Sequence, residues 1–148
     1  MLIGKVHRDA AQLRCDIDRS FWSLDCAKLW SKKRLARKRA ALSDIITAVL
    51  VRNPSYYYFQ GFHDIVSVLM LVFHDDILVF GVLEAMCQKF FSDYMRKDFS
   101  VLAKVMKLIM PLIKHADAEL YGHLEASCTE PFFATSWLIT WLSHDIRK

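Results

Sequence analysis

Two side chains in this sequence could assist the transfer of a phosphoryl group to water. Gln60 stands in Tyr58-Phe59-Gln60-Gly61, at the entrance to a long apolar segment. Its carboxamide can both donate and accept a hydrogen bond, so it can orient an attacking water molecule. Arg19 lies upstream, and its planar, always charged guanidinium can meet two anionic oxygens at once. Together they suggest a hypothesis of GTP hydrolysis assisted from outside the GTPase.

The composition indicates that a single helical domain positions these side chains. The chain has 148 residues, which is enough for one domain with a substantial core. Its hydrophobic share of 54% is too high for a disordered chain, and four Gly and three Pro are too few for the many turns of an all-β fold. We therefore predict an all-α fold without strands.

Apolar spacing and stop signals divide the chain into helices. Apolar residues recur every three or four positions between 33 and 51, and Asn53-Pro54 ends that helix because the residue before proline avoids the α region. Asp75-Asp76 and Glu130-Pro131 are typical of helix starts, while Pro111 should bend or end a helix. The predicted helices cover residues 7–18, 33–51, 60–73, 77–95, 98–113, 116–126 and 132–146.

Several aromatic residues are predicted to pack inside the fold. Residues 20–31 are expected to be irregular or a short turn, with Phe21, Trp22 and Trp30 as anchors. Residues 56–58, all tyrosines, are expected to be half-buried packing residues. Trp137 and Trp141 lie four positions apart on one helix face, which favours core packing.

Charge and cysteine usage favour a cytoplasmic protein. The net charge is +4, yet seven basic residues lie within positions 28–39, so the rest of the chain is mildly acidic. No apolar run reaches the roughly 18 residues that a membrane span needs, and no signal peptide is recognised. The four cysteines are scattered without a CxxC pair, as expected for buried free thiols in a reducing compartment.

Three segments together resemble the TBC domain, the family of Rab GTPase-activating proteins. Residues 13–20, Leu-Arg-Cys-Asp-Ile-Asp-Arg-Ser, are similar to the family's I-x-x-D-x-x-R motif, with Leu in the Ile place. Residues 58–61 match Y-x-Q-G in full. Residues 136–144 are similar to its tryptophan-bearing S-W-x-x-T-W helix. Asn53-Pro54, residues 60–65 (Gln-Gly-Phe-His-Asp-Ile) and residues 136–141 (Ser-Trp-Leu-Ile-Thr-Trp) also resemble the branch that is anchored in the endoplasmic reticulum and acts on Rabs of the early secretory pathway.

The resemblance implies a role for each motif residue. Arg19 would be an arginine finger, steadied by Asp16 one helical turn earlier, and Gln60 would replace the glutamine of the GTPase. Tyr58 would pack beneath the loop and hold Gln60 forward. Gly61 would let the backbone lie close to the bound Rab, because it has no Cβ. Asp64 is expected to support partner binding.

The same resemblance implies the partner and the location. The partner would be a Rab-family small GTPase, acting in vesicle trafficking at the cytosolic face of the endoplasmic reticulum or Golgi. The chain would need no cofactor of its own, because GTP and Mg²⁺ are carried by the partner, and it would be an activator without intrinsic enzymatic activity. The family's opening R-x-x-x-W motif is absent, and the chain stops just beyond the third motif. We therefore expect residues 1–148 to form a partial TBC domain, with membrane association through a segment outside this chain.

Three alternatives remain at this stage. A binding-only TBC-like protein would share the motifs without activating a GTPase. The pairs His63-Asp64 and His74-Asp75 are typical of metal-dependent HD phosphohydrolases, for which His7 and Asp93 could complete a ligand set. The basic cluster at 28–39, with Trp30 inside it, could bind nucleic acid or anionic lipid, face an acidic Rab, or simply be a solvated helix start. The proposed roles in GTP hydrolysis require the Arg19 guanidinium and the Gln60 carboxamide to lie in one groove.

Overall fold

The structure is a computed structural model that describes residues 7–22, 24–98 and 100–143. The described residues form helices and connecting turns, with no strand among them, as the all-α prediction requires. The helices are α1 (Ala10–Asp18), α2 (Asp25–Lys28), α3 (Lys32–Arg52), α4 (Phe62–Val72), α5 (Asp76–Met86), α6 (Ser100–Met106), α7 (Ile109–Ala116), α8 (Ala118–Ala126) and α9 (Thr135–Ile139). A π-helical turn, η1 (Cys87–Phe91), follows α5, and a 3-10 turn, η2 (Pro131–Ala134), precedes α9.

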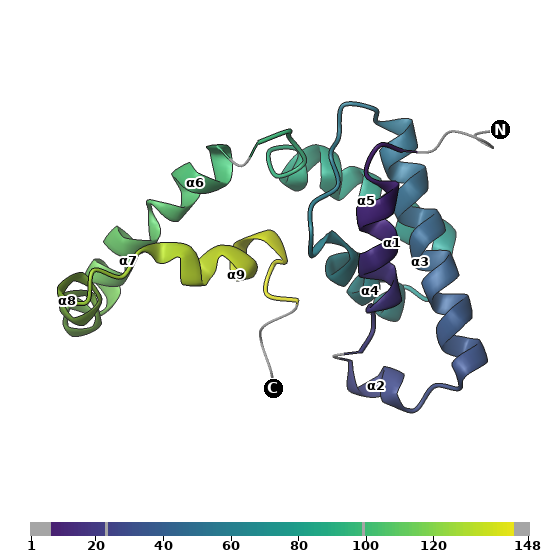
Figure 1. The fold of residues 1–148 in the computed structure, drawn as a ribbon, viewed down its shortest axis with the longest axis horizontal. Coiled ribbons are helices and arrows are strands. Elements are labelled where there is room, and N and C mark those ends of the chain that lie inside the picture. Colours follow the sequence, from purple (N-terminus) through teal and green to yellow (C-terminus); the bar gives the residue numbers. More distant parts are fainter. Residues whose placement is uncertain (1–6, 23, 99, 144–148) are drawn as a thin grey trace.

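Helices α1, α3, α4 and α5 form the packed part of the molecule (Figure 1). The predicted apolar stripe of α3 is buried at Leu42, Ile45, Ile46, Val49 and Leu50. Helix α4 contacts α1, α3 and α5, and it buries residues on several sides, as its almost continuous apolar sequence predicts. This arrangement fixes the end of α1 and the start of α4 relative to each other.

Helix α5 begins where the paired aspartates predict. The Asp75 carboxylate accepts hydrogen bonds from the backbone N–H groups of Ile77 and Leu78, at 2.8 and 3.1 Å. These bonds satisfy two donors that the first helical turn would otherwise leave unpaired. The prediction of one α-helix over 77–95 is wrong at its far end, because the α-helical pattern gives way to η1 at Cys87 and then to turns.

The C-terminal helices lead away from this group, and α9 returns toward α4 (Figure 1). The predicted helix 98–113 is interrupted at Lys107–Leu108, upstream of Pro111. Pro111 instead lies in the first turn of α7, where a missing N–H costs no helical hydrogen bond. The predicted helix 132–146 is also wrong in extent, because it starts as η2 and α9 ends at Ile139. Trp141 and Leu142 have positive φ values of 49° and 63°, which a right-handed helix cannot contain, and residues 144–146 lie outside the described part.

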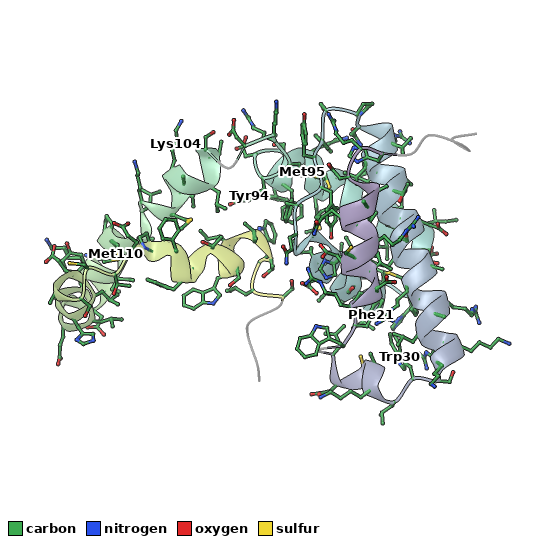
Figure 2. All side chains as sticks on the ribbon, viewed as in Figure 1. Phe21, Trp30, Tyr94, Met95, Lys104 and Met110 are labelled. Atoms are coloured by element: carbon green, nitrogen blue, oxygen red, sulfur yellow. The ribbon has the colours of Figure 1, made fainter. Side chains whose placement is uncertain are left out.

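Three tryptophans were expected inside and are not there. Trp137 and Trp141 remain 44% and 45% exposed; α9 is short, and Trp141 lies beyond its end. Trp137 contacts the Phe133 ring, and Trp141 contacts Phe91 at 4.8 Å between ring centroids. Trp22 is 64% exposed, whereas Phe21, before α2, and Trp30, after α2, do pack together (Figure 2). Among the described helices, none is both long enough and apolar enough to cross a bilayer.

Candidate functional site

One cleft of about 490 Å³ collects residues from all three sequence motifs. Its walls come from the end of α1, the start of α4 and the α9 region. The lining residues are Arg19, Trp22, Gln60, Gly61, His63, Asp64, Ser136, Ile139 and Thr140. The structure therefore brings Arg19 and Gln60, 41 positions apart in the sequence, to the wall of the same groove.

Arg19 follows the last turn of α1 and keeps its side chain 53% exposed. Its Nη2 makes an ion pair with Oδ1 of Asp16, one turn earlier on the same helix. A positive charge at this end of the helix is also favoured by the helix dipole. The guanidinium is thus tethered at one edge, while the rest of the group faces the cleft and solvent.

Asp16 is a fully buried carboxylate, with no exposed side-chain surface. An unpaired charge at such a position would be strongly destabilising, so its partners matter. Besides Arg19, the Tyr58 hydroxyl donates a hydrogen bond to Asp16 Oδ2 at 2.7 Å, and Gln12 Nε2 lies 3.5 Å from Oδ1. Asp16 is therefore not the solvated partner of a surface ion pair, and its position is fixed by the core.

Tyr58 and His63 extend this contact to the second motif. Burial, reinforced by the hydrogen bond to the Asp16 carboxylate, raises the pKa of Tyr58 well above its usual value. The hydroxyl is therefore protonated and can act as the donor. His63 is also buried, with Nδ1 3.1 Å from the Tyr58 hydroxyl and Nε2 3.4 Å from Asp64 Oδ1. The buried Asp16–Tyr58–His63 network thus joins the arginine segment to the glutamine segment.

Gln60 is exposed between two buried neighbours, Phe59 and Gly61. The loop before it is anchored, because the Tyr58 backbone N–H donates to Asp9 Oδ2 at 2.8 Å. The Phe59 ring packs on Phe62 at 5.2 Å between centroids. No hydrogen bond holds the Gln60 side chain among the described residues. The backbone is therefore fixed while the carboxamide is left available at the cleft.

Gly61 packs against another part of this chain, whereas it was expected to let the backbone lie close to a bound Rab. It caps α4 with a left-handed backbone, φ 97°, which glycine adopts without steric penalty. A Cβ at this position would lie 2.7 Å from Cγ2 of Thr140. Close approach to a bound partner is thus not needed to explain Gly61, because the third motif already occupies that space.

Sequence reasoning missed several residues of the cleft. The resemblance includes His63 without giving it a role, although a histidine on a largely apolar helix is a signal for a buried polar contact. Ser136 and Thr140 belong to the third motif, but the motif assigns them no role in the cleft, although their spacing of four places them on one helix face. Trp22 had no usable signal, because Phe21 and Trp22 are both large and apolar.

Residues 7–22, 24–98 and 100–143 offer no ligand set for the metal-dependent phosphohydrolase alternative. These residues contain no group of three or more His, Cys, Asp or Glu side chains placed to hold a metal ion. His63 is engaged with Tyr58 and Asp64, and His7 lies near Asp9, with 3.6 Å between Nδ1 and Oδ2.

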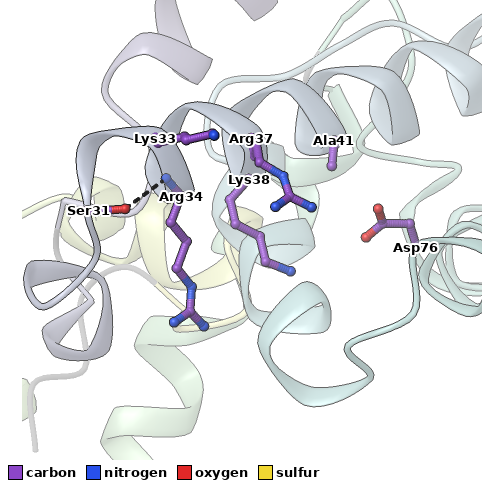
Figure 3. Close-up of a pocket in the computed structure, with 7 residues that line it drawn as sticks. All are labelled: Ser31, Lys33, Arg34, Arg37, Lys38, Ala41 and Asp76. Atoms are coloured by element: carbon purple, nitrogen blue, oxygen red, sulfur yellow. Dashed lines mark hydrogen bonds between the residues drawn. The ribbon is translucent and has the colours of Figure 1, made fainter.

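The basic cluster forms a second groove, separate from the cleft, with a volume of about 510 Å³ (Figure 3). Lys33, Arg34, Arg37 and Lys38 line it from α3, and Asp76 faces them from the start of α5. Ser31 caps α3 by accepting a hydrogen bond from the Arg34 backbone N–H at 3.2 Å. Residues 32–34 and 37 are exposed, which agrees with a solvated helix start. The binding of nucleic acid or lipid there stays a prediction.

Comparison with known proteins identifies the family. The sequence pattern of the family described as Rab-GTPase-TBC domain matches residues 3–147. The chain belongs to this family. The human TBC1 domain family member 20 is 34% identical over 103 residues, which cover 70% of this chain and 25% of that protein. GTPase-activating protein gyp10 of Schizosaccharomyces pombe is 29% identical over 140 residues, covering 95% of this chain and 36% of that protein.

A second yeast protein is also similar to this chain. GTPase-activating protein GYP8 of Saccharomyces cerevisiae is 26% identical over 161 residues, which cover 95% of this chain and 31% of that protein. The chain thus spans about a quarter to a third of the length of the curated relatives it matches.

Proposed function

We propose that this chain activates a Rab-family GTPase by supplying Arg19 and Gln60 to the partner's nucleotide. The observation that supports this most is the cleft itself, which is lined by residues of all three motifs. Membership of the Rab-GTPase-TBC domain family supports a Rab as the partner. Two of the matched relatives also carry the words GTPase-activating protein in their names.

The proposed mechanism stabilises the transition state of hydrolysis. Negative charge is spread over the transferring phosphoryl oxygens, and the attacking water must lie in line with the leaving oxygen. The exposed edge of the Arg19 guanidinium would meet these oxygens while Asp16 holds its other edge. The exposed Gln60 carboxamide would accept a hydrogen bond from the water and orient it.

The surrounding residues reduce the freedom of these two groups. The buried Asp16–Tyr58–His63 network fixes the relative positions of the two segments, so less ordering entropy is lost when the partner binds. The contact of Gly61 with Thr140 fixes the loop after Gln60 in the same way. GTP and Mg²⁺ would be carried by the partner, so this chain would supply no cofactor.

The location follows from the same proposal. The second and third motifs resemble those of the branch anchored in the endoplasmic reticulum, so the activity would serve Rabs at the endoplasmic reticulum or Golgi.

A hydrolysis assay over a panel of GTP-loaded Rabs tests the proposal. The chain should accelerate single-turnover hydrolysis for at least one Rab, and Arg19→Ala should remove about 10³–10⁵ of that acceleration. Gln60→Ala should also abolish the effect. The Gln60 side chain is exposed, so Gln60→Ala should keep the thermal midpoint of the unchanged chain. Arg19→Ala removes one partner of the buried Asp16 carboxylate, so its midpoint should fall, and hydrolysis is measured at a temperature well below it. Acceleration by none of the panel would reject the activator function, and binding without acceleration would favour the binding-only alternative.

A further inference from the structure

Trp22 differs from the other three tryptophans in having no aromatic partner among the described residues. Trp30 packs on Phe21 at 5.5 Å between ring centroids, Trp137 on Phe133 at 5.7 Å, and Trp141 on Phe91 at 4.8 Å. Trp22 is the most exposed of the four, at 64%, and it lines the same cleft as Arg19 and Gln60. A large apolar side chain is thus held in solvent three positions after the proposed catalytic arginine.

The backbone of the preceding residue explains this placement. Phe21 has a φ of 65°, a left-handed conformation that is unfavourable for a bulky residue. The turn before it is held by two hydrogen bonds: Ser20 Oγ donates to the Ile17 carbonyl at 2.8 Å, and Arg39 Nη2 donates to the Ser20 carbonyl at 3.1 Å. The Phe21 ring is buried, 3% exposed. The strained turn therefore sends Phe21 into the core and Trp22 out to the cleft.

We propose that Trp22 is a recognition anchor that packs against an apolar surface of the partner GTPase, next to its nucleotide. This inference rests on the proposed function, because it takes the partner to be the GTPase that Arg19 and Gln60 act on. Tryptophan is among the residues most enriched at the energetic centres of interfaces, since its rigid ring removes a large apolar area from water at little cost in conformational entropy.

The chemistry of the indole separates this role from catalysis. The ring carries no charge and only one hydrogen-bond donor, so it can neither neutralise phosphoryl oxygens nor accept a proton from water. It can contribute equally to the ground state and the transition state of the complex. Loss of such uniform binding raises KM and leaves kcat unchanged.

The test compares Trp22→Ala with Trp137→Ala, a matched loss of a half-exposed indole outside the cleft. Steady-state Rab hydrolysis and the Kd for the GTP-loaded Rab are measured for both variants. Trp22→Ala should raise KM and Kd by about tenfold or more, with kcat within about twofold, and Trp22→Phe should restore part of the affinity. Trp137→Ala should keep the KM and Kd of the unchanged chain. An unchanged KM and Kd in Trp22→Ala would overturn the proposal, as would a loss confined to kcat.

The same measurements separate this inference from the proposed function. If the unchanged chain binds a Rab but does not accelerate hydrolysis, the activator function fails, and the Kd of Trp22→Ala still decides whether Trp22 is an anchor. If the chain binds no Rab of the panel, the anchor is rejected together with the activator function.

Discussion

The clearest structural prediction concerns the hydroxyl of Tyr58. Tyr58→Phe removes a single oxygen, which donates a 2.7 Å hydrogen bond to the fully buried Asp16 carboxylate. A hydrogen bond to a charged group contributes about 1.5–3 kcal/mol, and water cannot replace it where the residue is only 8% exposed. The free energy of unfolding should therefore fall by about this amount. For a domain of this size, the midpoint of thermal unfolding should fall by roughly 3–12 °C.

The matched control is Tyr121→Phe, because its hydroxyl also donates to a carboxylate, Glu125 Oε1, at 2.6 Å. That bond is exposed, so water can replace it and the loss should stay within about 0.5 kcal/mol. Thermal unfolding followed by circular dichroism, together with urea titration, measures both variants. Equal midpoints for Tyr58→Phe and Tyr121→Phe would refute the idea that the network holds Asp16 in place.

Three further predictions concern backbone geometry, capping and thiol chemistry. Gly61→Ala should destabilise the fold by about 1–3 kcal/mol in urea titration, because φ is 97° and the new Cβ meets Thr140, while Gly81→Ala, at an exposed helical site with open space, should be neutral or stabilising by up to about 1 kcal/mol. Asp75→Ala should lower the free energy of unfolding by about 1 kcal/mol, since it removes the cap of α5; no loss would contradict the cap. Burial raises the pKa of the Cys87 thiol to about 12, so alkylation at pH 9 followed by peptide mass analysis should leave Cys87 unmodified until the chain is unfolded. The expectation of buried thiols is wrong for the other three cysteines, which are exposed: Cys15, Cys26 and Cys128. Equal labelling rates for Cys87 and these exposed thiols would contradict the burial of Cys87.

The sequence predicted those parts of the fold that depend on local periodicity. Helices α3 and α4 have regular apolar spacing and clear stop signals, so their extents agree with the prediction to within one or two residues. The failures occur where a tertiary contact overrides the local pattern. The α9 segment has helical spacing to the end of the motif, yet Trp141 packs across onto Phe91 with a positive φ and the helix stops.

The site was predictable in its residues but not in its geometry. The resemblance to the TBC motifs points to Asp16, Arg19, Tyr58 and Gln60, and their roles stay predictions. Spacing could not show that Asp16 is fully buried, because burial depends on segments more than 40 positions away. The sequence also could not predict that Phe21 is buried and Trp22 is exposed, because the positive φ of Phe21 directs the two rings to different sides.

The most direct test of the proposed mechanism is the affinity of the chain for a responsive Rab loaded with GDP, with and without aluminium fluoride. The fluoride complex imitates the transferring phosphoryl group, and transition-state analogues bind at least about 100-fold more tightly than ground states. The unchanged chain should show this gain, and Arg19→Ala and Gln60→Ala should each lose it while still binding the GDP form. Equal affinity for the GDP-loaded Rab with and without aluminium fluoride would contradict the assignment of Arg19 and Gln60 to the transition state. A gain in affinity that survives both substitutions would contradict it as well.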